Sequence, residues 1–155
     1  MNNKILVYIE IEKNSNIEYK YSKTEKLLII NNVFDPPFVY PYSYGFITNF
    51  ESNIELNINA FIITDKEIKN NEYYETYIIG LIAIENEKKM TEIFLSVLEE
   101  DYLKIKDIND LNDEIKDKIY NFFENYIKDN IPKKLKVIGY FNKNIALKVF
   151  KELIK

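Results

Sequence analysis

The chain has 155 residues, a net charge of −4 and 46 % hydrophobic residues, so we expect a single domain, residues 1–155, with a sizeable core. Histidine, cysteine, arginine and tryptophan are absent. Their absence excludes disulfides, ordinary zinc, iron or copper sites, and Ser-His-Asp or Cys-His catalysis. Any metal ion would be a hard cation, such as magnesium, held by oxygen atoms. The acidic charge argues against direct contact with nucleic acid.

The chain has no apolar run of about 18 residues, so we expect no membrane-spanning helix. Residues 1–4 lead directly into an alternating pattern and do not resemble a secretion signal. We therefore expect a cytoplasmic protein. The abundance of Lys, Asn, Ile and Tyr is typical of an A/T-rich genome, which limits the meaning of any single Arg-to-Lys exchange.

Residues 4–98 have the pattern of strands. Residues 4–12 alternate, with Ile5, Val7 and Ile9 on one face, which predicts the first strand. A loop rich in proline follows between Asp35 and Pro41, where regular pairing is blocked. The other predicted strands cover residues 18–21, 26–30, 46–50, 54–63, 74–85 and 92–98.

The pattern becomes helical at Asp110, which we expect to cap a helix that runs to Tyr126. Residues 135–140 predict a last strand. A final helix is expected to begin at Asn142 or Asn144. Many strands followed by helix, strand and helix predict a mainly-β member of the α+β class.

Four segments then resemble one family. Residues 40–47 (YPYSYGFI) resemble the Tyr-Pro-x-x-Tyr-Gly-Tyr-Ile segment of the soluble family I inorganic pyrophosphatases. Residues 7–11 (VYIEI), 101–111 (DYLKIKDINDL) and 122–126 (FFENY) resemble three further segments of that family, in the same order. The resemblance implies an OB-like five-stranded β-barrel with two flanking α-helices. It also implies magnesium-dependent hydrolysis of pyrophosphate and, at this length, a hexamer.

The acidic residues of that chemistry are missing. The family's metal motif, Asp-Gly-Asp-Pro-x-Asp, aligns with residues 54–59, which read IELNIN. The two aspartates of a second metal cluster, and a Lys two residues further on, align approximately with Asn86, Thr91 and Ile93. The family's Lys-Tyr-Glu triplet aligns with residues 18–20 (EYK), so both charges are reversed, and a phosphate-binding Arg aligns with Asn32. Several magnesium ligands and cationic phosphate contacts are therefore lost together.

The resemblance leaves a small set of residual site positions, with no confident catalytic residue and no metal expected. These positions are Glu10, Lys20, Tyr40, Tyr44, Asn59 and Tyr126. Weak candidates for a rebuilt magnesium site are Glu55, Glu85, Glu87 and Glu92, with Glu51 nearby. Each position also has a structural interpretation: the tyrosines can pack the loop over the barrel, Gly45 can supply a permissive backbone, and Glu10 can be either a cavity carboxylate or a solvated strand residue.

Three functions remain open. The first is a catalytically degenerate pyrophosphatase homologue, kept as a structural or binding subunit of a homo-oligomer or of a larger protein complex. The second is a divergent magnesium-dependent pyrophosphatase with relocated carboxylates. The third, least favoured because the chain is acidic and lacks arginine, is a module that binds phosphate or nucleotides without turnover.

Overall fold

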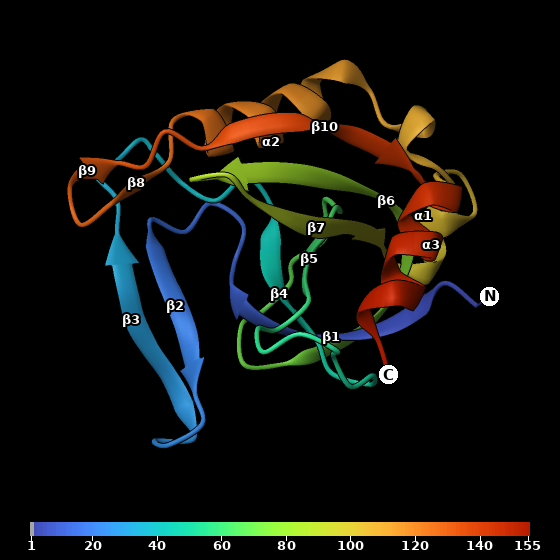
Figure 1. Ribbon diagram of the computed structural model, residues 1–155, viewed down its shortest axis with the longest axis horizontal. Coiled ribbons are helices and arrows are strands. Elements are labelled where there is room, and N and C mark those ends of the chain that lie inside the picture. The colour runs from blue at the N-terminus through green and yellow to red at the C-terminus, as the bar shows by residue number, and fades with distance from the viewer. Residues whose placement is uncertain (1) are drawn as a thin grey trace.

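The computed structural model describes residues 2–155 (Figure 1). No helix in this range is both long enough and apolar enough to cross a bilayer. The elements, in chain order, are β1 (Lys4–Ile11), β2 (Ile17–Ser22), β3 (Leu27–Val33), β4 (Ser43–Ile47), β5 (Asn59–Ile62), β6 (Tyr73–Asn86), β7 (Lys89–Val97), α1 (Glu99–Tyr102), the 3-10 helix η1 (Ile108–Asp110), α2 (Asp113–Glu124), β8 (Ile127–Lys128), β9 (Ile131–Pro132), β10 (Lys136–Asn142) and α3 (Lys143–Leu153).

Five strands form a closed sheet. Their order is β1-β4-β5-β7-β6, and an antiparallel pairing of β1 with β6 closes the ring. β10 adds to β6 outside this ring, and only β5 and β7 run parallel. β2 and β3 form a separate ribbon that projects from the ring (Figure 1). The predicted fold class, mainly β with a closed five-stranded sheet, is confirmed, although three α-helices rather than two are present.

Both faces of the sheet are buried, which explains the apolar runs in the sequence. Ala60 and Phe94 contribute to a cluster that also contains Phe150 of α3. Their neighbours Phe61 and Ile93 point the other way, into a cluster that contains residues of α2. Alternate residues of one strand therefore serve two cores, one under each long helix.

The segment between β4 and β5 corrects the sequence prediction. β4 begins at Ser43 and ends at Ile47, not at residue 50, and the strand predicted over residues 54–63 is ordered as a strand only at Asn59–Ile62. Residues 54–57 are exposed. The loop is instead fixed at its start, where the Asn53 Nδ2 donates to the carbonyl oxygen atoms of Glu152 at 3.0 Å and Ile154 at 2.8 Å. The apolar residues that suggested a strand have no sheet face to cover.

The helix caps gave one wrong prediction and one correct one. Asp110 does not cap α2; it ends η1, and its Oδ2 accepts from the Lys106 N–H at 2.9 Å. The cap of α2 is Asn112, whose Oδ1 accepts from the Ile115 N–H at 3.0 Å. Asn142 caps α3 as predicted. The elements α1, η1, β8 and β9 are too short to give a periodic signal and were not predicted.

The structure shows why a permissive backbone is required at Gly45. Its φ angle is not positive, so it does not supply a left-handed backbone. A Cβ at Gly45 would lie 1.8 Å from the carbonyl oxygen of Tyr8 on the paired strand β1. Only glycine allows β4 to approach β1 this closely, beside the bulge between Ile9 and Ile11.

Candidate functional site

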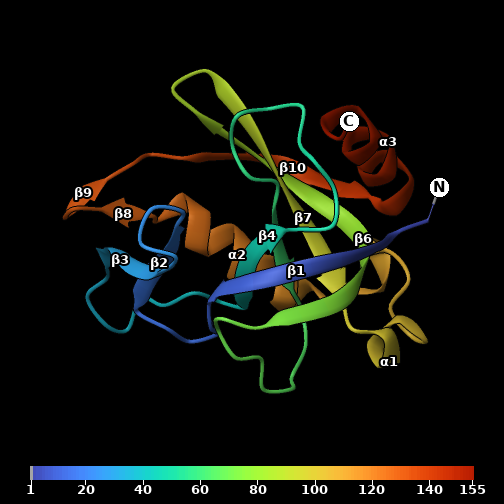
Figure 2. The same cartoon turned by 90° about the horizontal axis from the view of Figure 1, so that it is seen from below.

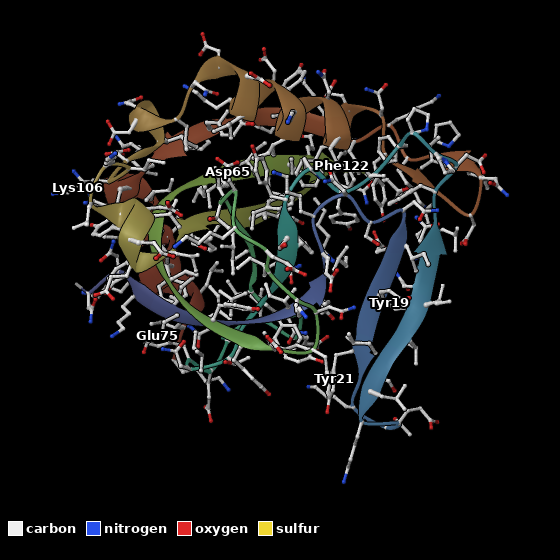
Figure 3. All side chains as sticks on the ribbon, turned by 180° about the vertical axis from the view of Figure 1, so that it is seen from behind. Tyr19, Tyr21, Asp65, Glu75, Lys106 and Phe122 are labelled. Atoms are coloured by element: carbon white, nitrogen blue, oxygen red, sulfur yellow. The ribbon has the colours of Figure 1, made fainter. Side chains whose placement is uncertain are left out.

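The candidate site lies where the loop after β3 crosses the sheet toward α2. Tyr40 is buried in this loop, and its ring centroid lies 4.5 Å from that of Phe122 and 5.5 Å from that of Tyr44. Figure 3 shows Phe122 on the side of α2 that faces this loop. The Tyr126 ring, just beyond α2, packs against Phe122 at 5.8 Å. Aromatic packing therefore places the hydroxyls of Tyr40, Tyr44 and Tyr126 near the end of the β2–β3 ribbon at which β2 begins and β3 ends.

Glu18 is at the centre of this arrangement. Its carboxylate is 8 % exposed, and its Oε1 accepts hydrogen bonds from the hydroxyls of Tyr40 and Tyr126, both at 2.6 Å. Its Oε2 accepts from the Asn31 Nδ2, also at 2.6 Å. Distances this short are typical of charge-assisted hydrogen bonds to a carboxylate. Three side chains from three separate segments thus converge on one acidic group.

Glu10 is a second buried carboxylate of the site. It is 6 % exposed and lies at the bulge in β1, which turns its side chain toward the β2–β3 ribbon. Its Oε2 accepts from the Tyr21 N–H at 2.7 Å. Burial raises the pKa of the Glu10 carboxyl. The hydrogen bond from the Tyr21 N–H and the charge of Lys20 oppose this increase, and the nearby charge of Glu18 adds to it. Glu10 is therefore a buried carboxylate and not a solvated strand residue.

Tyr44 and Asn59 meet across β4 and β5, because both side chains lie on the α2 face of the sheet. Burial raises the pKa of Tyr44, the charges of Glu10 and Glu18 raise it further, and the Asn59 side chain opposes the shift. Burial and Glu18 likewise raise the pKa of Tyr40 and Tyr126. These hydroxyls therefore stay protonated and act as hydrogen-bond donors.

Two asparagines of β3 connect the ribbon to the β8–β9 hairpin. Asn32 is 5 % exposed, and its Nδ2 donates to the Ile127 carbonyl at 2.8 Å. Its Oδ1 accepts from the Asp129 N–H at 3.3 Å. Beside it, the Lys128 Nζ lies 3.4 Å from the carbonyl oxygen of Asn31. At the position where the resemblance implies a phosphate-binding Arg, Asn32 instead joins two hairpins.

The structure brings most of the predicted site positions together. The cluster of side chains around Glu18 contains Glu10, Tyr40, Tyr44, Asn59 and Tyr126. Lys20 is exposed beside it. Glu18 was missed as a site residue although its triplet was recognised. The available signal was the spacing of Glu18 and Lys20 on β2. Residues two apart in a strand point to the same face, so a site at Lys20 also indicates Glu18.

The weak metal candidates lie elsewhere. Glu55 is exposed in the β4–β5 loop. Glu85, Glu87 and Glu92 lie on the β6–β7 hairpin, whose turn extends beyond the closed sheet in Figure 2. This turn has only two residues, Glu87 and Lys88, both with positive φ. Such a turn holds charged side chains outward, in solvent.

The residues do not fit a magnesium centre of the kind the resemblance implies. Within residues 2–155, no three acidic side chains lie together in an arrangement that would hold a metal ion. Glu10 and Glu18 are both bonded to donors of the protein itself. Ile93, at a position aligned with a Lys of the family, is 4 % exposed and packs in the same apolar cluster as Tyr40. No reaction step through a metal ion is therefore derived.

A groove of about 220 Å³ adjoins the cluster. It lies between the two hairpins and the loop after β3, and it is lined by Val33, Phe34, Asp35, Phe38, Ile127 and Asn130. Phe34 separates this groove from Tyr40 and Tyr126, because its ring centroid lies 5.9 Å from that of Tyr40 and 5.7 Å from that of Tyr126. The groove thus lies on the outer side of the aromatic layer formed by the packed rings of Phe34, Tyr40, Phe122 and Tyr126.

The model of the family described as inorganic pyrophosphatase matches residues 7–155. The chain therefore belongs to the inorganic pyrophosphatase family. It is 33 % identical to the inorganic pyrophosphatase of Helicobacter pylori strain J99 over 156 aligned positions, covering 97 % of this chain and 90 % of the relative. It is 29 % identical to that of Nanoarchaeum equitans, covering 96 % and 94 %.

Solved structures agree on the fold. An inorganic pyrophosphatase from Helicobacter pylori superposes with a TM-score of 0.89 at 30 % identity, covering 98 % of this chain and 92 % of the other. One from Coxiella burnetii gives 0.87 at 24 % identity, covering 98 % and 94 %. Membership of the inorganic pyrophosphatase family, expected from four short segments, therefore extends over almost the whole chain.

Proposed function

We propose that this member of the inorganic pyrophosphatase family is catalytically degenerate and serves as a structural or binding subunit of an assembly. The observation that carries this proposal is the position of Glu18. Its carboxylate accepts hydrogen bonds from Tyr40 and Tyr126, at the position aligned with a cationic residue of the family. The hydroxyls of Tyr40 and Tyr126 are thus engaged in hydrogen bonds within the fold.

Charge is the physical argument against turnover. Pyrophosphate is a highly charged anion, and hydrolysis requires cations that neutralise it and activate water. The site instead presents two buried carboxylates, Glu10 and Glu18. In a buried environment like charges repel strongly, so these groups disfavour an anionic substrate. Residues 54–59 also argue against turnover. The acidic side chains that would hold the neutralising metal ions align there with apolar or amide side chains.

The second candidate is a divergent magnesium-dependent inorganic pyrophosphatase. The names of the relatives favour it over the first candidate: the similar proteins from Helicobacter pylori and Nanoarchaeum equitans, which align with nearly the whole chain, are inorganic pyrophosphatases. In this case the metal ions would be held by relocated carboxylates, drawn from Glu10, Glu51, Glu55, Glu85, Glu87 and Glu92.

Phosphate release from pyrophosphate, measured with magnesium and with manganese, separates the two candidates. The proposal expects no release above a blank, whereas the Helicobacter pylori enzyme serves as the positive control. Release that is abolished by Glu10→Ala, and unchanged by the matched exposed variant Glu12→Ala, would establish the divergent enzyme. Glu12 lies directly after β1 and is exposed, so the second variant controls for the loss of a neighbouring acidic side chain.

The assembly role is tested separately. We propose a homo-oligomer or a complex with another protein in the cytoplasm. Mass measurement of the purified chain, together with co-purification from native cells, tests for both. A solitary monomer in both experiments contradicts the assembly role, whatever the result of the pyrophosphate assay.

A further inference from the structure

A buried carboxylate that gathers three donors from separate segments resembles a bound anion more than a surface charge. The hydroxyls of Tyr40 and Tyr126 and the Asn31 amide all reach Glu18 at 2.6 Å. These donors come from the loop after β3, the segment just beyond α2, and β3 itself. The two tyrosines are held by packing that does not involve Glu18, because both rings pack against the Phe122 ring.

The charges around the cluster also suit an anion. The Lys128 Nζ lies 3.4 Å from the carbonyl oxygen of Asn31, and the charge of Lys20 acts on Glu10. Without Glu18, the two lysines would have one fewer carboxylate near them. The hydroxyls of Tyr40 and Tyr126 and the Asn31 amide would lose their acceptor, and of these the Tyr40 hydroxyl belongs to a buried residue. An unsatisfied buried donor is unfavourable, so such a site would draw in an external oxyanion.

We propose that Glu18 is an internal anion that fills and closes a latent oxyanion site formed by Tyr40, Tyr126 and Asn31. The site would accept a small carboxylate or inorganic phosphate only when Glu18 is removed. This inference deepens the proposed function and rests on it, because it names the residue that keeps external anions out. It also explains how these three donors are satisfied by a group of the chain itself.

Chemical rescue tests the inference. In Glu18→Ala the carboxylate is removed and a space remains beside the three donors. We expect formate to raise the melting temperature of this variant, relative to chloride at equal ionic strength, because binding to the folded state stabilises it by mass action. A difference of about 2–4 °C is expected at saturating formate. Inorganic phosphate is the second probe, and it tests whether the site is wide enough for a tetrahedral anion.

Matched variants make the result specific. The wild-type chain and Glu18→Gln should show no difference between formate and chloride, because in both the space is filled. Adding Tyr126→Phe to Glu18→Ala should reduce the rescue at least severalfold in formate affinity, since one donor is lost. If Glu18→Ala is unfolded in chloride, the same experiment is read as recovery of the native circular dichroism signal in formate.

The outcomes are decisive in either direction. Equal melting temperatures of Glu18→Ala in formate and chloride, recovery in neither salt, or an equal formate effect on the wild-type chain would each overturn the inference. Failure of the proposed function is seen in a different experiment, as pyrophosphate turnover by the wild-type chain. The two failures are therefore distinguishable.

Discussion

Two neighbouring segments, residues 40–47 and residues 54–59, differ sharply in what the fold requires of them. The first includes Tyr40, which packs against α2, and Gly45, which allows β4 to approach β1. The second is mostly an exposed loop, with only Ile58 buried and Asn59 half-buried. The difference teaches that substitutions in the first segment should disturb packing, whereas substitutions in the second should cost little stability. The following predictions test this contrast.

The largest effect is expected for Phe122→Ala. This ring is 4 % exposed and contacts the rings of Phe34, Phe38, Tyr40 and Tyr126. Its removal should lower the free energy of unfolding by about 4 kcal/mol, because a cavity opens in the aromatic layer. Urea denaturation measures the loss. Tyr120→Ala, on the exposed side of α2, is the control and should change stability far less.

Gly45→Ala should follow closely. The added Cβ would meet the Tyr8 carbonyl oxygen at 1.8 Å, so one of the two strands must move. We expect a loss of about 3 kcal/mol in urea denaturation. Gly139→Ala on β10 is the matched control, because a Cβ there meets nothing within 4 Å. Equal effects of the two substitutions would show that close approach is not the reason for Gly45.

Tyr40→Phe should cost about 2 kcal/mol, because it removes a hydrogen bond to the buried carboxylate of Glu18 while keeping the ring. Tyr126→Phe removes the second donor to the same oxygen. A double-mutant cycle should give a coupling energy of about 0.5 kcal/mol or more between them. Tyr73→Phe, whose side chain is exposed, is the control. Additive effects would contradict a shared acceptor.

A smaller effect is expected from pH. Burial raises the pKa of Glu10 in the folded state, so its carboxyl binds a proton more tightly there than in the unfolded chain. This contribution to stability is complete below the unfolded pKa and is lost as pH rises through the folded pKa. Glu10→Gln should therefore gain stability relative to wild type as pH rises through the folded-state pKa of Glu10, which lies above the ordinary range of a glutamate. Thermal unfolding at several pH values measures this gain, and a constant difference would contradict it.

The smallest effect is expected in the exposed loop. Glu55→Ala and Leu56→Ser should each change the free energy of unfolding by no more than about 0.5 kcal/mol, because both side chains are solvent-exposed. Urea denaturation provides the measurement. A loss comparable to that of Gly45→Ala would break the contrast, since it would give the loop a structural role that its exposure does not suggest.

The sequence alone was sufficient for the family, for the succession of strands along most of the chain and for the start of α3 at Asn142, one of the two predicted positions. Alternation over residues 4–12 and helical spacing around Phe122 and Phe123 arise from local geometry, so they are visible in one dimension. The strand predicted over residues 54–63 was wrong in its first part, because Ile54 and Leu56 have no sheet face to cover, and the strand is formed only at Asn59–Ile62. The cap predicted at Asp110 was wrong because this residue belongs to the 3-10 helix η1, and Asn112 caps α2 instead.

Only the tertiary structure decided which residues make the site. The resemblance placed Glu10, Tyr40, Tyr44, Asn59 and Tyr126 there. For Glu18 the only sequence signal was its spacing from Lys20 along β2, and that spacing did not show that Glu18 is buried and Lys20 exposed. Residues 18, 40 and 126 are far apart in the chain and meet only because the ribbon, the crossing loop and the end of α2 converge. Hydrogen bonds between such segments depend on packing in three dimensions, and no local pattern records them.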